Sequence, residues 1–225
     1  MFPHQKPPAW LKAVTAGCLI WQMPAGKNRV YLTFDDGPHP EVSLRLMETL
    51  QLFNARATFF VQGEKAVRHA PIVETLLQSG HGLGSHGWSH LDGWATKRAA
   101  YLENIEKLWE LYPLHLFRPP YGRITPCQVA GLKRKKIKTV MWSLSTMDYN
   151  LKVNPATSLA FLKSQITDGS IILMHDTPAA EHSLMHILPG MLDFLAHRGY
   201  TTAVLPGAFM LEDLNQTAKF DTFAE

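Results

Sequence analysis

Short apolar runs rich in β-branched and aromatic residues recur along the chain and predict buried strands. Each run has the length of a strand and is separated from the next by a longer segment of different pattern. The runs lie at Val30 to Phe34, Ala57 to Val61, Gly82 to Ser85, Leu114 to Phe117, Thr139 to Leu144, Ser170 to Met174 and Thr201 to Leu205.

Between these runs, apolar residues recur at helical spacing and predict amphipathic helices. The clear stripes run from Val42 to Phe53, Val67 to Leu77, Leu102 to Trp109 and Leu184 to Leu195, with weaker ones near 126–135 and 156–167. Gly80, Gly169 and Gly199 stand where a helix should stop before the next strand. Strand and helix therefore alternate along the chain, which predicts a mainly parallel α/β fold. This pattern alone does not distinguish a closed barrel from an open, doubly wound sheet.

No internal repeat or linker divides the chain, so we expect one domain from about residue 26 to 206, with extensions at 1–25 and 207–225. The N-terminal extension contains a short apolar stretch, 13–21, and its Thr15 to Cys18 segment loosely resembles a lipoprotein processing site. Lys12 interrupts the apolar character, and the stretch is short for an export signal. We therefore expect residues 1–25 to pack against the domain, and the amphiphilic tail after Pro206 either to pack as a helix or to project.

The composition fits a protein with a sizeable core and without a polyanion-binding surface. The chain has 225 residues, 46% of them hydrophobic, and 22 Lys and Arg against 19 Asp and Glu give a formal charge of +3. The basic run 133–136 is predicted to be the solvated end of a helix, so no nucleic-acid partner is expected. Cys18 and Cys127 are too few for a disulfide framework or a metal-ligand motif. No apolar run approaches the roughly 20 residues that a membrane-spanning helix needs.

Polar residues able to do chemistry follow the predicted strands. In parallel α/β folds the ligand site lies at the carboxyl ends of the strands, so side chains placed there converge on one face. The residues concerned are Asp35 and Asp36 after the first run, His86 and His90 after the third, Arg118 after the fourth, Asp148 after the fifth and His175 after the sixth.

Asp36, His86 and His90 are candidate metal ligands. Two imidazoles and one carboxylate bind a divalent ion such as Zn²⁺ and leave positions open for water and substrate. Of two adjacent aspartates beside a cation, one can bind the metal while its neighbour accepts a proton from the metal-bound water.

Each of these motifs also has a structural interpretation. An Asp-Asp-Gly-Pro segment is more often a turn, and histidines four residues apart are often structural. His182 and His186 have the same spacing but lie on a predicted surface helix without a nearby loop carboxylate. We do not expect that second pair to bind metal.

Five ordered segments carry a family resemblance: Thr33-Phe34-Asp35-Asp36-Gly37, Ser85-His86-Gly87-Trp88-Ser89-His90, Arg118-Pro119-Pro120-Tyr121, Trp142 through Asp148-Tyr149, and Ile172-Leu173-Met174-His175-Asp176. In this order and spacing the chain resembles the polysaccharide deacetylases of the NodB-homology type, carbohydrate esterase family 4. The resemblance extends from Val30 to about Leu205. It implies a distorted (β/α)7 barrel and metal-dependent removal of acetyl groups from N-acetylated sugars of the N-acetylglucosamine type.

The resemblance also implies roles for individual residues. The metal, Zn²⁺ in the first place and Co²⁺ or another divalent ion as the alternative, would be bound by Asp36, His86 and His90. Asp35 would be the general base, oriented and held ionised by Arg118. His175 would be the general acid, with Asp148 tuning its pKa. The backbone N–H of Tyr121 would stabilise the oxyanion, and Trp142 and Leu173 would line the pocket for the acetyl methyl group.

The chain departs from the family pattern at a few positions. Gly87 replaces the usual Ser or Thr after the first metal histidine, which removes a hydroxyl that could brace the metal loop. In the fourth segment Ser145 stands where an acid is frequent, and Tyr149 where a Trp is frequent. Trp94 suggests an aromatic loop near the mouth of the site, which would either pack locally or stack on a sugar.

The expected partner is an N-acetylated carbohydrate. One alternative is a hydrolase of a non-sugar amide or imide on the same fold, because fold does not fix substrate. Another is an inactive carbohydrate-binding homologue. The sequence leaves open the glycan and its length, the native metal, the oligomeric state and the compartment.

Overall fold

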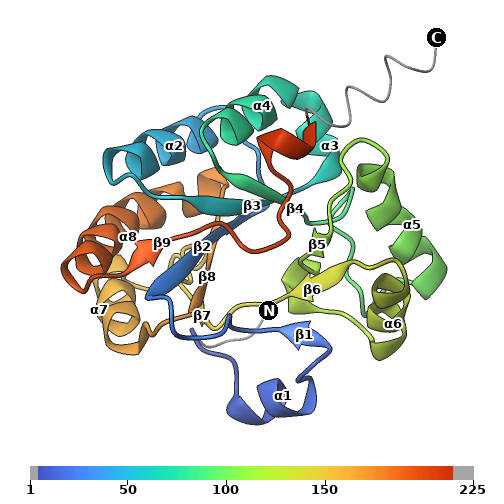
Figure 1. The fold of residues 1–225 in the computed structure, drawn as a ribbon, viewed down its shortest axis with the longest axis horizontal. Coiled ribbons are helices and arrows are strands. Elements are labelled where there is room, and N and C mark those ends of the chain that lie inside the picture. Colours follow the sequence, from blue (N-terminus) through green and yellow to red (C-terminus); the bar gives the residue numbers. More distant parts are fainter. Residues whose placement is uncertain (1–4, 215–225) are drawn as a thin grey trace.

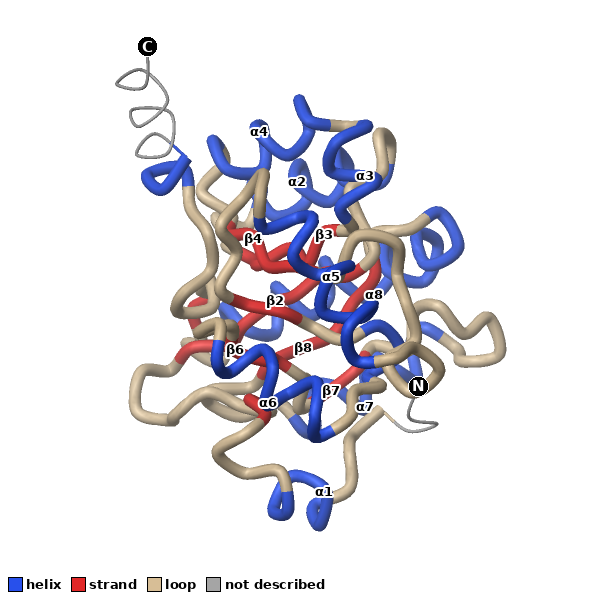
Figure 2. The backbone as a smooth tube through the Cα atoms, turned by 90° about the vertical axis from the view of Figure 1, so that its right-hand side faces the viewer, coloured by secondary structure: helices blue, strands red, loops and turns tan. Residues whose placement is uncertain are grey.

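The computed structural model describes residues 5–214, and in this part of the chain the strands form one curled parallel sheet surrounded by helices (Figure 1). The strand order is β1-β6-β5-β4-β3-β2-β8-β7, with β9 pairing on β2, and every ladder between these strands is parallel. Seen from the side, the strands occupy the middle of the molecule and the helices lie outside them (Figure 2). The predicted distorted (β/α)7 barrel is confirmed as this curled sheet.

The strands are β1 (Leu19–Ile20), β2 (Arg29–Asp35), β3 (Ala57–Val61), β4 (Gly82–Ser85), β5 (Leu116–Phe117), β6 (Lys138–Val140), β7 (Leu144–Ser145), β8 (Ile171–His175) and β9 (Thr201–Thr202). The α-helices are α1 (Ala9–Val14), α2 (Val42–Leu52), α3 (Gly63–Arg68), α4 (Ala70–Gln78), α5 (Arg98–Trp109), α6 (Pro126–Arg134), α7 (Pro155–Gln165) and α8 (Pro178–His197). A single 3₁₀ turn, Pro120–Gly122, follows β5. None of the helices among residues 5–214 is both long and apolar enough to cross a membrane.

Alternation of side chains along the strands divides the core into two layers. On β2, Val30, Leu32 and Phe34 pack outward with α2, α4 and α8 in the main hydrophobic cluster. Tyr31 points the other way, into a second cluster inside the curled sheet that includes Leu173 of β8. The inward positions of β2 and β8 therefore line the interior of the barrel.

Local signals place several helix ends where the sequence pattern predicts them. Thr125 and Gln128 form a reciprocal capping box at the start of α6, and Asn154 caps α7 through its side chain. Gly80 and Gly199, which follow α4 and α8, have φ of 77° and 70°, in the left-handed region that a glycine adopts most easily. These glycines end the helices and turn the chain into the next strand.

The predicted strand 139–144 is instead two short strands, β6 and β7, at opposite ends of the sheet path. Nε of Arg118 donates a hydrogen bond to the carbonyl oxygen of Val140 at 3.4 Å, and Nη2 donates to that of Met141 at 2.9 Å. These two carbonyls are therefore bonded to a side chain and not to a neighbouring strand. The N–H of Met141 bonds to Ile20 of β1, whereas that of Ser143 bonds to Ile171 of β8. This segment therefore crosses from one end of the sheet to the other and links them.

Other differences from the predicted elements are small. The stripe from Val67 to Leu77 is split into α3 and α4, because the chain breaks at His69 and restarts with Pro71 in the first turn of α4. β5 and β9 are shorter than the apolar runs that predict them. The pattern does not predict α1 or β1, which are both very short.

The N-terminal residues that the structure describes contact both ends of the sheet path. β1 pairs with β6, and the carbonyl of Gln5 accepts a hydrogen bond from the N–H of Ser145 in β7 at 2.7 Å. Trp21 is buried against Trp142, with ring centroids 6.5 Å apart.

Only 207–214 of the predicted C-terminal tail are described, and 215–225 lie outside the described residues. Within 207–214, Phe209 is buried and exchanges two backbone hydrogen bonds with Leu83 of β4.

Candidate metal centre and active site

The ends of β2 and β8 bring Asp35 and His175 together inside the barrel. The two residues are register partners in the parallel ladder, two positions beyond the paired Thr33 and Leu173. Because side chains alternate along a strand, Asp35 follows Thr33, and His175 follows Leu173, onto the same inward face. A carboxylate and an imidazole thus meet at the carboxyl ends of neighbouring strands, where parallel α/β folds bind ligands.

Arg118 lies behind Asp35 and is fully buried. Its Nη1 donates to Oδ1 of Asp35 and to the hydroxyl of Thr33, both at 2.7 Å, and its guanidinium stacks on the ring of Phe60, 4.1 Å from the centroid. Burial lowers the pKa of Arg118, while the charge and hydrogen bond of Asp35 act in the opposite direction. A buried charge held by a carboxylate and several hydrogen bonds is fixed in place, so Arg118 also fixes the orientation of Asp35.

Asp148 plays the corresponding part behind His175. Its Oδ1 lies 2.8 Å from Nδ1 of His175, and its Oδ2 accepts the backbone N–H of the same residue at 2.8 Å. Burial lowers the pKa of His175, but the charge and hydrogen bond of Asp148, helped by Asp35 and Asp36, outweigh burial and raise it to about 9. This raised pKa favours the positively charged imidazolium form of His175 at neutral pH, with its Nδ1 hydrogen-bonded to Asp148.

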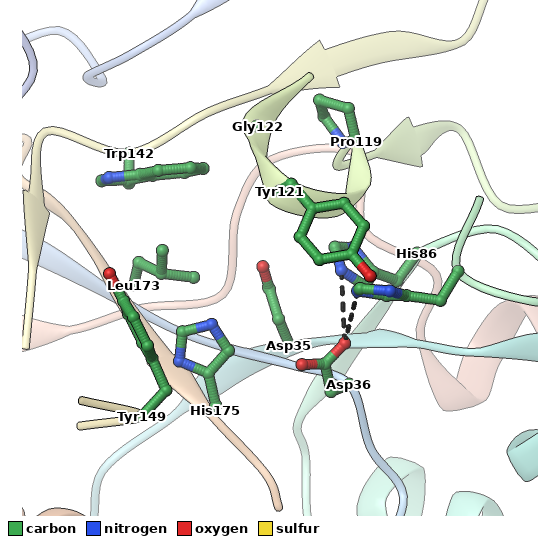
Figure 3. Close-up of a pocket in the computed structure, with 11 residues that line it drawn as sticks. Asp35, Asp36, His86, Pro119, Tyr121, Gly122, Trp142, Tyr149, Leu173 and His175 are labelled. Carbon is green, nitrogen blue, oxygen red and sulfur yellow. Dashed lines mark ion pairs between the residues drawn. The ribbon is translucent and has the colours of Figure 1, made fainter. Parts of the chain in front are cut away.

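Asp36 and His86 lie across the pocket from His175 (Figure 3), and His90 converges with them. One ligand atom from each lies within 4.8 Å of the other two, and Oδ1 of Asp36 is 3.5 Å from Nε2 of His86 and 3.0 Å from Nε2 of His90. This is the one cluster of three potential metal ligands found among residues 5–214. The rings of His182 and His186 on α8 lie 4.6 Å apart and are tilted by 53° to each other, but no third ligand joins them there.

The chemistry of the three donors fits a divalent cation. Nδ1 of His86 bonds to the carbonyl of Arg118 at 2.8 Å, so it carries the ring proton and leaves Nε2 as a lone-pair donor toward Asp36. Burial lowers the pKa of His86, which favours the neutral imidazole, while the charges of Asp35 and Asp36 act in the opposite direction. Burial raises the pKa of Asp36, but the hydrogen bond from His90 and the neighbouring histidine charges outweigh it and hold that pKa well below its usual range. Neutral imidazoles and an ionised carboxylate are the forms that bind Zn²⁺ and similar ions.

The backbone at two of these ligands is strained, and nearby side chains hold it. Asp36 and His90 have φ of 72° and 56°, a region that residues other than glycine rarely adopt. Lys65 donates to the carbonyl of Asp36 at 2.7 Å, and Gln62 donates to its Oδ1 at 2.8 Å. The sequence motifs do not include Gln62 and Lys65, although Gln62 directly follows β3 and the strand-end rule could have identified it.

The loop that carries His86 and His90 is braced by Asn104 of α5. Its Oδ1 accepts the N–H of Trp88 at 2.9 Å, and its Nδ2 donates to the hydroxyl of Ser89 at 2.8 Å. A Cβ on Gly87, where φ is 79°, would lie 3.1 Å from the same Oδ1. Asn104 thus braces the loop that lacks a hydroxyl at position 87.

The remaining walls of the pocket are apolar and aromatic. Trp142 and Leu173 lie on the His175 side, and Tyr121 lies over the imidazoles (Figure 3). Trp142 fits closely against Gly122, because a Cβ at that glycine would come within 2.8 Å of the indole. Tyr149 makes an edge contact with His175 at 5.1 Å, so the aromatic residue that replaces the usual Trp still forms part of the wall.

The pocket is about 320 Å³ and collects most of the predicted site residues. Its lining includes Asp35, Asp36, His86, His90, Tyr121, Trp142, Leu173 and His175. Arg118 and Asp148 do not line it; they bind Asp35 and His175 from behind. The structure therefore brings the ten residues together: eight surround the pocket, and two contact Asp35 and His175 from behind.

Comparison with known proteins identifies the family of the chain. The family model described as polysaccharide deacetylase matches residues 22–140, which is more than half of the chain. The chain belongs to the polysaccharide deacetylase family. A family member from Bacillus cereus, a peptidoglycan-N-acetylglucosamine deacetylase, is 31% identical over 193 residues, covering 83% of this chain and 70% of that protein. A chitooligosaccharide deacetylase from Azorhizobium caulinodans is 30% identical and covers 84% of this chain and 93% of its own.

A solved structure of the family has the same fold. It is a peptidoglycan N-acetylglucosamine deacetylase in complex with 4-naphthalen-1-yl-N-oxidanyl-benzamide, 28% identical to this chain. It superposes with a TM-score of 0.82 over 90% of this chain and 97% of that one.

Proposed function

We propose that this protein is a metal-dependent N-deacetylase that removes acetyl groups from an N-acetylated glycan of the N-acetylglucosamine type. The observation that carries the proposal is the cluster of Asp36, His86 and His90 beside an arginine-bound carboxylate, Asp35, with a protonated histidine, His175, across the pocket. An amide hydrolase needs an activated water, a polarised carbonyl and a proton donor together. The site contains a group suited to each task.

Asp36, His86 and His90 would hold the metal, with Zn²⁺ as the first choice and Co²⁺ or another divalent ion as the alternative. When bound, the cation supplies Lewis-acid polarisation of the acetyl carbonyl and activation of the attacking water. Asp35 is the general base: it lines the pocket next to the ligand cluster, and Arg118 fixes its orientation.

His175 is the general acid. Its proton on Nδ1 is held by Asp148, so Nε2 is the atom that donates a proton to the departing amine nitrogen. The base is paired with the cation of Arg118, and the acid is paired with the carboxylate of Asp148.

Tyr121, Trp142 and Leu173 would position the acetyl group. Trp142 and Leu173 form an apolar wall for the methyl group, and the backbone N–H of Tyr121 would stabilise the negative charge that develops on the carbonyl oxygen. The substrate class is supported by the relatives, whose names specify peptidoglycan N-acetylglucosamine and chitooligosaccharides.

The proposal is tested by acetate release from N-acetylglucosamine oligomers, using protein loaded with Zn²⁺ or Co²⁺ and chelator-treated protein as the control. We expect release that depends on metal. Metal-loaded protein that binds the cation but releases no acetate would contradict the proposal. Hydrolysis of amide or imide compounds would then identify a hydrolase of a non-sugar substrate. Binding of oligomers without turnover would identify an inactive carbohydrate-binding homologue.

Replacing Asp35 separates the base from the ligands. We predict that Asp35→Asn lowers kcat by at least about 10³-fold while bound metal, measured by elemental analysis, stays near one equivalent. His86→Ala should lose both the metal and the activity. Turnover by Asp35→Asn at the parental rate would rule out Asp35 as the base.

A further inference from the structure

The indole of Trp94 stands exposed beside the pocket, on the loop between β4 and α5. Its side chain is 68% exposed, and its ring contact is with the guanidinium of Arg123, whose Cζ lies 5.1 Å from the ring centroid. Of the two roles that the sequence leaves open, the packing on Arg123 covers only part of the ring and leaves the rest accessible to a ligand. An exposed, fixed aromatic ring at the edge of a ligand pocket is instead typical of a binding surface.

The loop that carries Trp94 is held rigidly. Asp92 accepts the backbone N–H of Trp94 at 2.9 Å, and the buried side chain of Gln128 donates to the carbonyl of Gly93 at 2.8 Å. A Cβ at Gly93 would lie 2.3 Å from the carbonyl of Arg123, so the two segments approach as closely as a glycine allows. The indole is therefore presented to solvent by a fixed backbone, which reduces the entropy lost when a ligand binds.

Arg123 connects Trp94 to the pocket. It forms an ion pair with Asp92, and its guanidinium lies 5.7 Å from the ring of Tyr121 as well as over the Trp94 indole. Tyr121 in turn lines the pocket and packs edge-on against His90, with centroids 4.6 Å apart. Trp94 is thus separated from the pocket wall by one side chain, that of Arg123.

The size of the pocket requires a surface outside it. At about 320 Å³ it lies at the lower end of the range for small-molecule sites, with room for one acetylated sugar. The neighbouring sugars of a glycan must then lie on the rim. The axial C–H groups of a pyranose form an apolar face that stacks on an indole, and guanidinium N–H groups can donate to its hydroxyls.

We propose that Trp94, positioned by Arg123 and Asp92, is a stacking platform for the sugar adjoining the one whose acetyl group enters the pocket. The inference rests on the proposed function and extends it. The substrate class is an oligosaccharide, and a longer oligosaccharide binds better because its additional sugar contacts Trp94. The enzyme should therefore work better on oligomers than on the shortest substrate it accepts.

The kinetic test compares kcat/KM across a series of N-acetylglucosamine oligomers for the parent, Trp94→Ala and Trp94→Phe. We expect kcat/KM of the parent to rise with length. Trp94→Ala should lose about tenfold on the longest oligomer, mainly through KM, and stay within about twofold on the shortest. Trp94→Phe should keep part of the length dependence, because a smaller ring still stacks.

Trp109→Ala is the matched control. Trp109 is 42% exposed at the end of α5, just before β5 and so at the opposite end of the strands from the pocket. Its replacement should leave the length dependence unchanged. The platform is ruled out if Trp94→Ala retains the parental length dependence, if it loses activity equally on every length, or if the parent shows no length dependence.

A binding measurement separates this inference from the proposed function. Indole N–H signals of ¹⁵N-tryptophan-labelled protein are followed by NMR during titration with the N-acetylglucosamine tetramer, and the Trp94 signal is assigned from Trp94→Phe. We expect that signal to shift while the Trp109 signal does not. A shift without acetate release would support the platform and contradict the deacetylase. Acetate release with an unmoved Trp94 signal at saturation would do the reverse.

Discussion

Burial lowers the pKa of His175, and the group that chiefly raises it is Asp148, which binds both its ring and its backbone N–H. The other charged groups that face it, Asp35 and Asp36 from the end of β2, act in the same direction, and together they raise that pKa to about 9 against the effect of burial. A histidine with a raised pKa is protonated below that value and loses its proton, and its ability to act as an acid, as pH rises through it.

We therefore predict that Asp148→Asn moves the basic limb of the pH profile of kcat/KM to lower pH by at least about one unit. Activity at pH 8 should fall about twofold or more relative to the optimum, because about half or less of His175 is then protonated. The field of a bound cation acts on parent and variant alike, so the difference between the two profiles is the readout. Asp193→Asn, in the exposed pair with His197, is the matched control. Superimposable profiles of Asp148→Asn and parent would show that Asp148 does not tune the acid.

Single residues at strand ends are what the sequence predicts best. Asp35, His86 and His175 come directly after or at the end of apolar runs, so a simple topological rule places them on one face. Asn104, by contrast, is in the middle of α5, and nothing in its own segment marks it as a brace for the loop after β4. Its role depends on a contact between segments that are distant in the pattern.

At the scale of elements, the strand β1 and the residue after it support the pocket from behind. Trp21 is 5% exposed, its Nε1 donates to the hydroxyl of Thr15 at 2.8 Å, and its ring packs edge-on against Trp142. Trp142 forms the wall expected to contact the acetyl methyl group. The N-terminal segment therefore determines how firmly that wall is held.

We predict that Trp21→Ala lowers the free energy of unfolding by about 3–5 kcal/mol, measured by urea denaturation, because it leaves a cavity behind Trp142. It should also relax acyl specificity, so that the ratio of kcat/KM for N-acetyl over N-propionyl substrates falls several-fold. Trp21→Phe, which keeps an aromatic edge, should retain most of that ratio. An unchanged acyl preference in a folded Trp21→Ala protein would contradict this support role.

The apolar runs predict β2, β3, β4 and β8 almost to the residue, because these strands are buried on both faces. β2, β3 and β8 are also rich in β-branched or aromatic residues, whereas β4, Gly82–Ser85, has none. They fail for 139–144, where all the residues are equally buried but the backbone bonds to different partners along its length. The apolar character of a segment predicts that it is buried. The division of 139–144 into β6 and β7 depends instead on the hydrogen bonds that Arg118, distant in the sequence, donates to the carbonyls of Val140 and Met141.

At the scale of the whole molecule, the three candidate ligands couple two separate βα loops. Asp36 follows β2, and His86 and His90 follow β4. A cation bound by both loops stabilises the folded chain, because the unfolded chain does not bring these residues together.

We predict that free Zn²⁺ at a hundred times its Kd raises the free energy of unfolding by about 2.7 kcal/mol, and Tm by roughly 5–10 °C. Chelation should reverse the shift, and His86→Ala should abolish it. His186→Ala, in the exposed pair on α8, is the control and should keep it in full. Equal stabilisation of His86→Ala and His186→Ala by Zn²⁺, followed by differential scanning calorimetry, would place the bound metal elsewhere.

The hydrophobic pattern of the sequence does not predict whether the sheet closes into a barrel, which is a property of the whole molecule. Alternating strands and helices fit a barrel and an open sheet equally well, since both bury the same apolar faces. The choice depends on the segment between β6 and β7 and on the N-terminal residues at Gln5 and in β1, which join the two ends of the sheet path. These contacts are long-range, and no local preference encodes them.

The position of β2 in the sheet has a consequence for the order in which the protein can fold. β2 is made early, yet it pairs with β8 and β9, which begin at Ile171 and Thr201. A ribosome must therefore synthesise most of the chain before the edge of β2 that faces β8 is covered. Until then this apolar strand is exposed to wrong pairing, and a chaperone that shields a growing chain should increase the yield of native protein.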